Sequence, residues 1–205
     1  YTQPQARGGE LPADTLAEAL ELAERGAVGS GRPKEMSKIY EVVSSGARGR
    51  FGRRAAHYRG ARFFEQRGDL PLALRHAAQA FAAVPSEGAT FLLLARTAER
   101  AGDPGAAVLT IEEVASGARS AGVRAAWLLR AADVAGSGED GARRRVDLLL
   151  RAALLTPTVS VINRLGDSGR ALLRYAPEER DALQIRFGRA SKTLTQRLDG
   201  PDGAR

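Results

Sequence analysis

A 34-residue spacing of glycines limits most strongly how this chain folds. Gly68, Gly102 and Gly136 follow one another at this spacing. Each ends a segment whose apolar residues recur at helical spacing, and these segments are residues 55–67, 89–101 and 123–135. A fixed period of this length is typical of proteins built from stacked copies of one helical unit. The sequence therefore predicts an array of repeated helical units.

The residues that follow the first two glycines predict a tight turn and a second helix. Glycine just past a helix end adopts the left-handed conformation at little cost. Asp69 and Asp103 come next, and an aspartate there caps the following helix by accepting hydrogen bonds from its free N–H groups. Pro71 and Pro104 then fall in the first turn, where a missing N–H does no harm. Each unit is predicted to be a helix, a Gly-Asp turn and a second helix.

This unit resembles the tetratricopeptide repeat, which has the same period. In the first unit the matching residues are Ala61, Phe64, Gly68, Ala73, Ala80 and Pro85. In the second unit they are Ala95, Ala98, Gly102, Ala107 and Val114. Arg119 replaces the closing proline of the second unit. With four inserted residues the third unit matches at Ala152 and Pro157, but Arg145 takes a small-residue position, which leaves the packing of that helix open.

The resemblance implies an all-α fold, a right-handed α–α superhelix of stacked units. Stacking is needed because one unit alone cannot bury its apolar face. Residues 54–157 would form three such repeats. Residues 13–53 would form a divergent helix pair, with helices at 13–25 and 33–44, a loop at 26–31 and a Gly/Arg-rich connector at 46–52.

The C-terminal part is predicted to cap the array. Within residues 158–198 we expect two short helical pieces, 159–165 and 170–175, around a turn at 166–169, and then a long helix at 177–198. End units need a polar outer face, which the long helix would supply. Residues 1–12 and 199–205 are predicted to be flexible tails.

The composition excludes several kinds of chemistry. The chain has no cysteine, which rules out disulfides, thiol nucleophiles and zinc knuckles. It contains no HExxH, GxSxG or Walker-type motif, and the glycine-rich residues 166–169 lack the strand and lysine of a phosphate loop. His57 and His76 are expected to be packing or surface residues. We therefore predict a protein that is not an enzyme and has no cofactor or metal.

The net charge of +7 leaves two explanations open. Of the 31 basic residues only three are lysine, and this arginine bias is typical of a GC-rich, bacterial genome. The alternative is a nucleic-acid surface formed by the basic stretches 48–54, 143–145 and 186–197. No stretch approaches the ~18 apolar residues of a membrane helix, so we expect no membrane insertion. The cytoplasm is favoured over the periplasm as the compartment.

An arginine and an acid recur at fixed positions in the predicted first helices. The arginines are Arg62, Arg96 and Arg130, and the acids are Glu65, Glu99 and Asp133. The resemblance implies that the arginine position faces a concave groove, where Tyr58 and Leu92 would add apolar contact area. Trp127 is expected in the core. Either these residues bind a partner, or each arginine forms a salt bridge with the acid three residues later in its own helix.

These features predict a non-catalytic scaffold for protein–protein interaction. Its groove would bind a protein or peptide segment, and the arginines favour an acidic segment. The alternatives are a nucleic-acid-binding repeat protein and a regulatory fragment of a larger protein. The second alternative arises because the chain begins at Tyr1 and not at methionine.

Overall fold

The computed structural model describes residues 13–47 and 49–198, and ten α-helices account for most of them. They are α1 (Ala13–Gly29), α2 (Met36–Gly46), α3 (Gly49–Gln66), α4 (Leu70–Ala83), α5 (Gly88–Ala101), α6 (Pro104–Ser116), α7 (Ala121–Asp133), α8 (Gly138–Leu155), α9 (Val159–Leu172) and α10 (Arg180–Leu198). Short 3-10 turns, Pro33–Glu35 and Pro177–Glu179, precede α2 and α10. No β-strand occurs in the two described ranges, and the predicted all-α class is confirmed. Both predicted tails lie outside the described residues.

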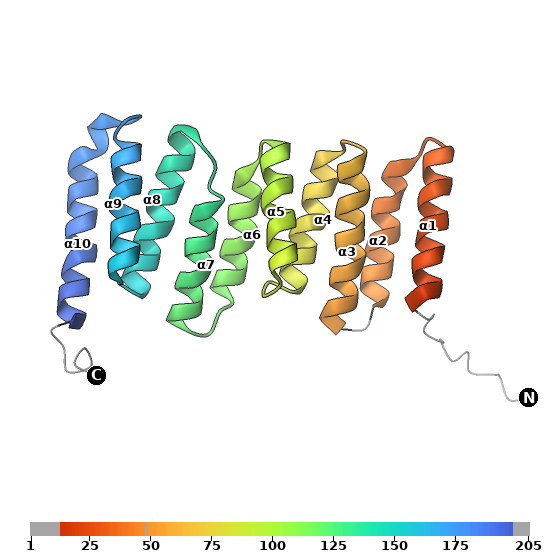
Figure 1. The fold of residues 1–205 in the computed structure, drawn as a ribbon, viewed down its shortest axis with the longest axis horizontal. Coiled ribbons are helices and arrows are strands. Elements are labelled where there is room, and N and C mark those ends of the chain that lie inside the picture. The colour runs from red at the N-terminus through yellow and green to blue at the C-terminus, as the bar shows by residue number, and fades with distance from the viewer. Residues whose placement is uncertain (1–12, 48, 199–205) are drawn as a thin grey trace, which may run out of the picture.

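The helices stand side by side in one row that follows the order of the chain (Figure 1). Helices α1 and α10 form the two ends of the row. The helices pack mainly on their neighbours in sequence, and α10 also packs on α8. Such contacts are local in sequence, which is the arrangement that stacked helical units produce. In the described part of the chain, no helix has both the length and the apolar character that a membrane span requires.

The predicted turn chemistry is confirmed. The turn glycines have φ angles of 72° at Gly68, 68° at Gly102 and 87° at Gly136, all in the left-handed region. The Asp69 carboxylate accepts a hydrogen bond from the Leu72 N–H at 3.4 Å, and Asp103 accepts one from Ala106 at 3.0 Å. The Gly-Asp pair therefore ends one helix and caps the next in both units, as expected from the sequence.

In the third unit, Arg145 occupies a position where the sequence pattern expects a small residue. Its side chain does not lie between the two packed helices. Its guanidinium donates hydrogen bonds to the carbonyl oxygens of Ala132 at 3.1 Å and Gly136 at 2.8 Å, and so satisfies carbonyls at the end of α7. The inserted residues lengthen α8 to 18 residues, against 14 in α4. Gly141 lets the start of α8 lie close to the turn at Gly136, because a Cβ on Gly141 would lie 2.6 Å from the Gly136 backbone.

Two predicted connections are helical in part. The connector expected at residues 46–52 is wrong in its second half, since α3 begins at Gly49. The loop expected at 26–31 is shorter than predicted, because α1 extends to Gly29. Glycine has a low intrinsic helix propensity, but the glycines in these segments do not interrupt the helices. The other predicted elements of this region, the two N-terminal helices, are confirmed.

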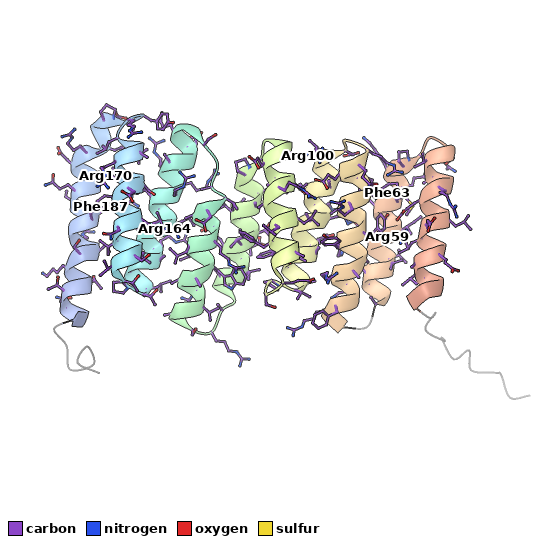
Figure 2. All side chains as sticks on the ribbon, in the orientation of Figure 1. Arg59, Phe63, Arg100, Arg164, Arg170 and Phe187 are labelled. Carbon is purple, nitrogen blue, oxygen red and sulfur yellow. The ribbon has the colours of Figure 1, made fainter. Side chains whose placement is uncertain are left out.

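The turn expected at residues 166–169 is also wrong, because α9 is continuous from Val159 to Leu172. Gly169 is buried within this helix, and a Cβ at that position would lie 2.4 Å from Cζ of Phe187. Phe187, labelled in Figure 2, comes from α10, the long C-terminal helix that the sequence predicted. Gly169 is therefore a contact site that lets α10 pack closely on α9.

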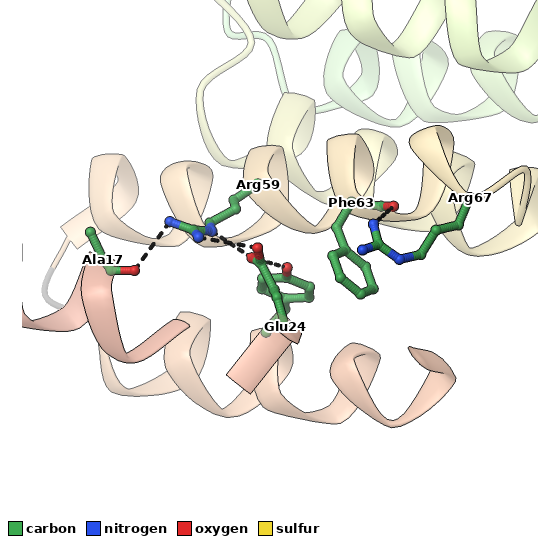
Figure 3. Close-up of polar contacts among 6 residues, drawn as sticks. Ala17, Glu24, Arg59, Phe63 and Arg67 are labelled. Atoms are coloured by element: carbon green, nitrogen blue, oxygen red, sulfur yellow. Dashed lines mark hydrogen bonds and ion pairs between the residues drawn. The ribbon is translucent and has the colours of Figure 1, made fainter. Parts of the chain in front are cut away.

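Polar contacts connect α1 and α2 to α3, the first helix of the first predicted repeat (Figure 3). Glu24 of α1 accepts hydrogen bonds from the Tyr40 hydroxyl at 2.5 Å and from Arg59 Nε at 2.5 Å and Nη2 at 3.1 Å. Arg59 of α3 also donates to the backbone oxygen of Ala17 at 3.4 Å. The predicted N-terminal helix pair is thus connected to the array by a bidentate ion pair.

Candidate partner-binding surface

An open hollow of about 720 Å³ lies between α5 and α7. Four of the predicted site residues line it: Leu92, Arg96, Glu99 and Asp133. Arg145, Pro104 and Gly136 contribute to the same lining. Side chains from α5 and α7, at positions 34 residues apart or close to them, therefore line one hollow.

Two side chains in this hollow have no visible structural role. Leu92 is 67% exposed although it is a large apolar residue. The Glu99 carboxylate is exposed, and within residues 13–47 and 49–198 it has no hydrogen-bond or ion-pair partner. Both side chains therefore have contacts available for a molecule bound in the hollow.

A second hollow, of about 330 Å³, adjoins the first and shares Arg96 with it. Glu65, whose side chain is only 5% exposed, lies at its floor among three arginines. Glu65 Oε2 accepts a hydrogen bond from Arg96 Nη2 at 2.8 Å, and Oε1 accepts one from Arg100 Nη1 at 2.8 Å. Arg62 Nη1 stands 3.7 Å from the same carboxylate. The salt bridge inside one helix, between Arg62 and Glu65, is thus longer than the two that cross from α5 to α3.

The cross-helix pairing recurs at the other end of the array. Arg164 of α9 binds Asp133 of α7 at 2.5 Å, and the two residues are 31 positions apart, as are Arg96 and Glu65. Figure 2 shows Arg100 and Arg164 on α5 and α9. Sequence reasoning missed Arg164, although it follows Arg130 at the same spacing as the earlier arginines follow one another. Arg164 is thus the fourth arginine at this spacing, and it lies in the helical piece that was predicted at residues 159–165.

Arg130 and Tyr58 lie outside both hollows. The Arg130 guanidinium carbon is 5.2 Å from the centre of the Phe91 ring and 5.1 Å from that of Trp127, which is a cation–π arrangement. Tyr58 is half-buried against the core, beside the Arg54 guanidinium. Trp127 packs on the core, with its ring centre 5.6 Å from that of Phe81, which confirms its prediction. The predicted row of three groove arginines is therefore interrupted at Arg130.

The two histidines form a buried pair that the sequence analysis did not foresee. Nδ1 of His57 lies 3.0 Å from Nδ1 of His76, and Nε2 of His76 lies 3.1 Å from Ser37 Oγ. Burial lowers the pKa of His76 to about 4 and also lowers the pKa of His57. Both rings are neutral near pH 7 and have a packing role. Among the described residues no group of three or more His, Asp or Glu side chains is placed to hold a metal ion.

Four arginines of the predicted basic stretches, Arg54, Arg143, Arg145 and Arg186, contact oxygen atoms of the chain itself. Arg54 binds Glu87 at 2.5 Å, and Arg186 binds Asp147 at 2.9 Å. Arg143 lies within 4 Å of the carboxylates of Glu139, Asp140 and Glu179. These guanidinium groups therefore link neighbouring helices and turns. Among the described basic residues of these stretches, Arg50, Arg53, Arg144, Arg189 and Lys192 make no hydrogen bond or ion pair with a carboxylate.

No protein-family model, curated protein or solved structure matches this chain, so its assignment depends on the fold and on the surface described above.

Proposed function

We propose that this chain is a tetratricopeptide-like repeat scaffold that binds a segment of a partner protein across α3, α5 and α7. The 34-residue period, the three left-handed turn glycines and the row of helices packed in chain order support the repeat assignment. In arrays of this kind each helix pair adds a small rotation, which produces a superhelix with an extended concave binding surface.

The observation that carries the proposal is the pair of adjoining hollows that share Arg96. They combine an exposed apolar side chain, Leu92, with an unpaired carboxylate, Glu99, and several arginines. Peptide-binding surfaces need this combination, because apolar contacts supply affinity and a few directed polar groups fix the orientation.

Nucleic-acid binding is the second candidate, and fewer observations support it. Four arginines of the basic stretches, Arg54, Arg143, Arg145 and Arg186, contact carboxylates or backbone carbonyls of the chain itself. Binding through phosphate contacts would weaken steeply as salt increases, because those contacts release counterions. A protein-segment ligand held partly by Leu92 should show a weaker dependence on salt.

Selection of random peptides displayed on phage tests the proposal. Peptides enriched on the wild-type protein should bind the double variant Leu92→Ser/Glu99→Gln at least ~10-fold more weakly, since a central contact contributes about 1–2 kcal/mol or more. Neither substitution removes a described hydrogen bond or ion pair of the side chain, so the variant should fold normally. Circular dichroism would verify this.

A matched control is available on α6, which is the second helix of its predicted repeat unit. Leu109 is 63% exposed and Glu113 is exposed, so Leu109→Ser/Glu113→Gln makes the same chemical change away from the hollows. The control should retain wild-type peptide affinity. Equal affinities for the wild type and both variants would contradict the proposed binding surface.

A further inference from the structure

The second hollow differs from an ordinary surface ion pair in its balance of charge. Three arginines, Arg62, Arg96 and Arg100, surround one carboxylate, and that carboxylate is the only acid among the described residues of the lining. The cluster therefore carries two positive charges that no described lining residue compensates. We name these four residues, with Glu65 at the centre, the Glu65 cradle.

The geometry also leaves hydrogen-bond donors unused. An arginine side chain has five N–H donors in a fixed plane. Arg96 and Arg100 each donate one hydrogen bond to Glu65, and Arg62 makes only the longer 3.7 Å contact. The arginine side chains are about half exposed, whereas Glu65 is buried. The remaining N–H groups of these three guanidiniums have no partner among the described residues, and all three side chains line the hollow.

Glu65 also fixes the positions of these donors before any ligand binds. Because Glu65 is held in the wall between α3 and α5, the two guanidinium groups that it accepts from have already lost much of their rotational freedom. A ligand that binds pre-positioned side chains loses less entropy on association. The hollow of about 330 Å³ has space for about ten water molecules at ~30 Å³ each, which exceeds what one anionic group needs.

We infer that the Glu65 cradle binds a doubly negative group on the partner segment, either a phosphate monoester or two adjacent carboxylates. This inference rests on the proposed function and adds the chemistry that the partner must present. Arginine forms paired hydrogen bonds with both kinds of group, and a dianion matches the two excess charges. A phosphodiester of a nucleic-acid backbone carries a single charge and matches them less well.

The experiment uses the whole chain and four small probes in ~150 mM salt, where exposed charges are largely screened beyond about 8 Å. The dianions are N-acetylphosphoserine amide and N-acetyl-Asp-Asp amide. N-acetylserine amide is the neutral control, and dimethyl phosphate represents a phosphodiester. The readout is the NMR signal of each arginine Nε–Hε group as the probe concentration rises, and the substituted arginines identify their own signals by disappearance.

One or both dianions should shift the signals of Arg62, Arg96 and Arg100 to saturation, and the tighter of the two identifies the source of the charge. Dimethyl phosphate should bind at least ~10-fold more weakly, and the neutral probe should cause no shift. Arg96→Gln/Arg100→Gln should weaken binding by ~10-fold or more. Arg62→Gln should also weaken dianion binding. Because this substitution removes no hydrogen bond to Glu65, its effect on binding cannot come from a loss of that bond, which keeps the test valid if the double variant folds poorly.

The matched control is Arg151→Gln/Arg186→Gln, which removes two arginines that both contact Asp147. Arg151 is 47% exposed and Arg96 48%, so the changes in charge and exposure are alike. The control should bind the dianion as the wild type does. Equal weak shifts at all exposed arginines, or equal affinity for dimethyl phosphate, would overturn the inference. Peptide binding that depends on Leu92 and Glu99 would still support the proposed function in that case.

Discussion

The two ends of this array are stabilised by different interiors, although the same type of helix pair builds both. The N-terminal cluster consists of Leu20, Met36, Tyr40, Phe63, Phe64 and Ala73, and aromatic rings fill most of it. A longer cluster runs from Ala61 to Ala190 and consists mainly of alanine, leucine and valine. In the described chain, every buried polar or charged side chain lies between Ser37 and Thr97.

The difference shows that stacking requires only local complementarity between neighbouring units. Alanines such as Ala131 and Ala153 are fully buried and let helices approach closely without a polar partner. In and beside the N-terminal cluster, buried rings have polar partners: the Tyr40 hydroxyl donates to Glu24, and His76, which stacks on Phe64, contacts His57 and Ser37. Each unit interacts only with its nearest neighbours. An aromatic interior at one end and an aliphatic interior along the rest can therefore occur in the same array.

The largest expected effect is a loss of stability in the N-terminal interior alone, which would let the two interiors unfold at different urea concentrations. Phe64→Ala should lower the free energy of unfolding of the N-terminal helices by about 3–5 kcal/mol, because Phe64 is fully buried and leaves a cavity. Urea unfolding followed by circular dichroism should then show a first transition that the fluorescence of Trp127, the single tryptophan, does not report. Leu128→Ala, one residue from Trp127, is the counterpart and should shift the fluorescence transition. Coincident transitions in both variants would mean that the two interiors unfold as one.

The second effect depends on pH and is confined to the N-terminal interior. The pKa of His76 in the folded protein is about 4, below its unfolded value of ~6.5, so the unfolded chain binds more protons as pH falls between these values. Stability that is present above pH ~6.5 is therefore lost on acidification. Between pH 7.5 and 5 the loss from His76 should be about 2 kcal/mol, and His57 adds to it in the same direction.

Urea titrations at several pH values would measure this dependence. The N-terminal transition should move to lower urea on acidification, while the Trp127 transition should change little over the same range. A His76→Gln variant should reduce the pH dependence. An N-terminal transition that is constant between pH 7.5 and 5 would contradict the neutral buried histidine pair.

The smallest effect compares one substitution in the two regions. Gly60→Ala should destabilise the protein by about 1–3 kcal/mol, because the added Cβ would lie 2.9 Å from Cδ2 of Tyr40 and 3.1 Å from Nδ1 of His76. Gly166→Ala should stabilise it by about 0.5–1 kcal/mol, because Gly166 is inside α9 and its nearest neighbour would be Arg170 Nη1 at 3.8 Å. Thermal unfolding measures both. A destabilised Gly166→Ala variant would favour the turn that the sequence predicted there.

Much of the fold could be predicted because its signals are local. The glycine spacing, the capping aspartates Asp69 and Asp103 and the first-turn prolines specify helix ends through contacts within a few residues. Errors occurred where a glycine serves a contact between helices, as at Gly169 against Phe187. Glycine at a helix end and glycine at a close helix contact look alike in one sequence, and only the packing separates them.

The candidate surface was predictable in part for the same reason. Periodicity alone grouped Leu92, Arg96, Glu99 and Asp133, because equal positions in successive units face the same way. It could not show that Arg96 and Arg100 reach back to Glu65, or that Arg130 lies over two aromatic rings. Those choices depend on the distance between neighbouring helices and on side-chain rotamers.

By itself, then, the sequence determined the helical unit, its period and the faces on which residues recur, because hydrophobic periodicity and helix capping act over a few residues. Only the tertiary structure decided which charges pair, which remain free and where the hollows lie. Ion pairing is set by distances of a few ångströms between side chains about 31 positions apart, and stacking of the helices fixes those distances.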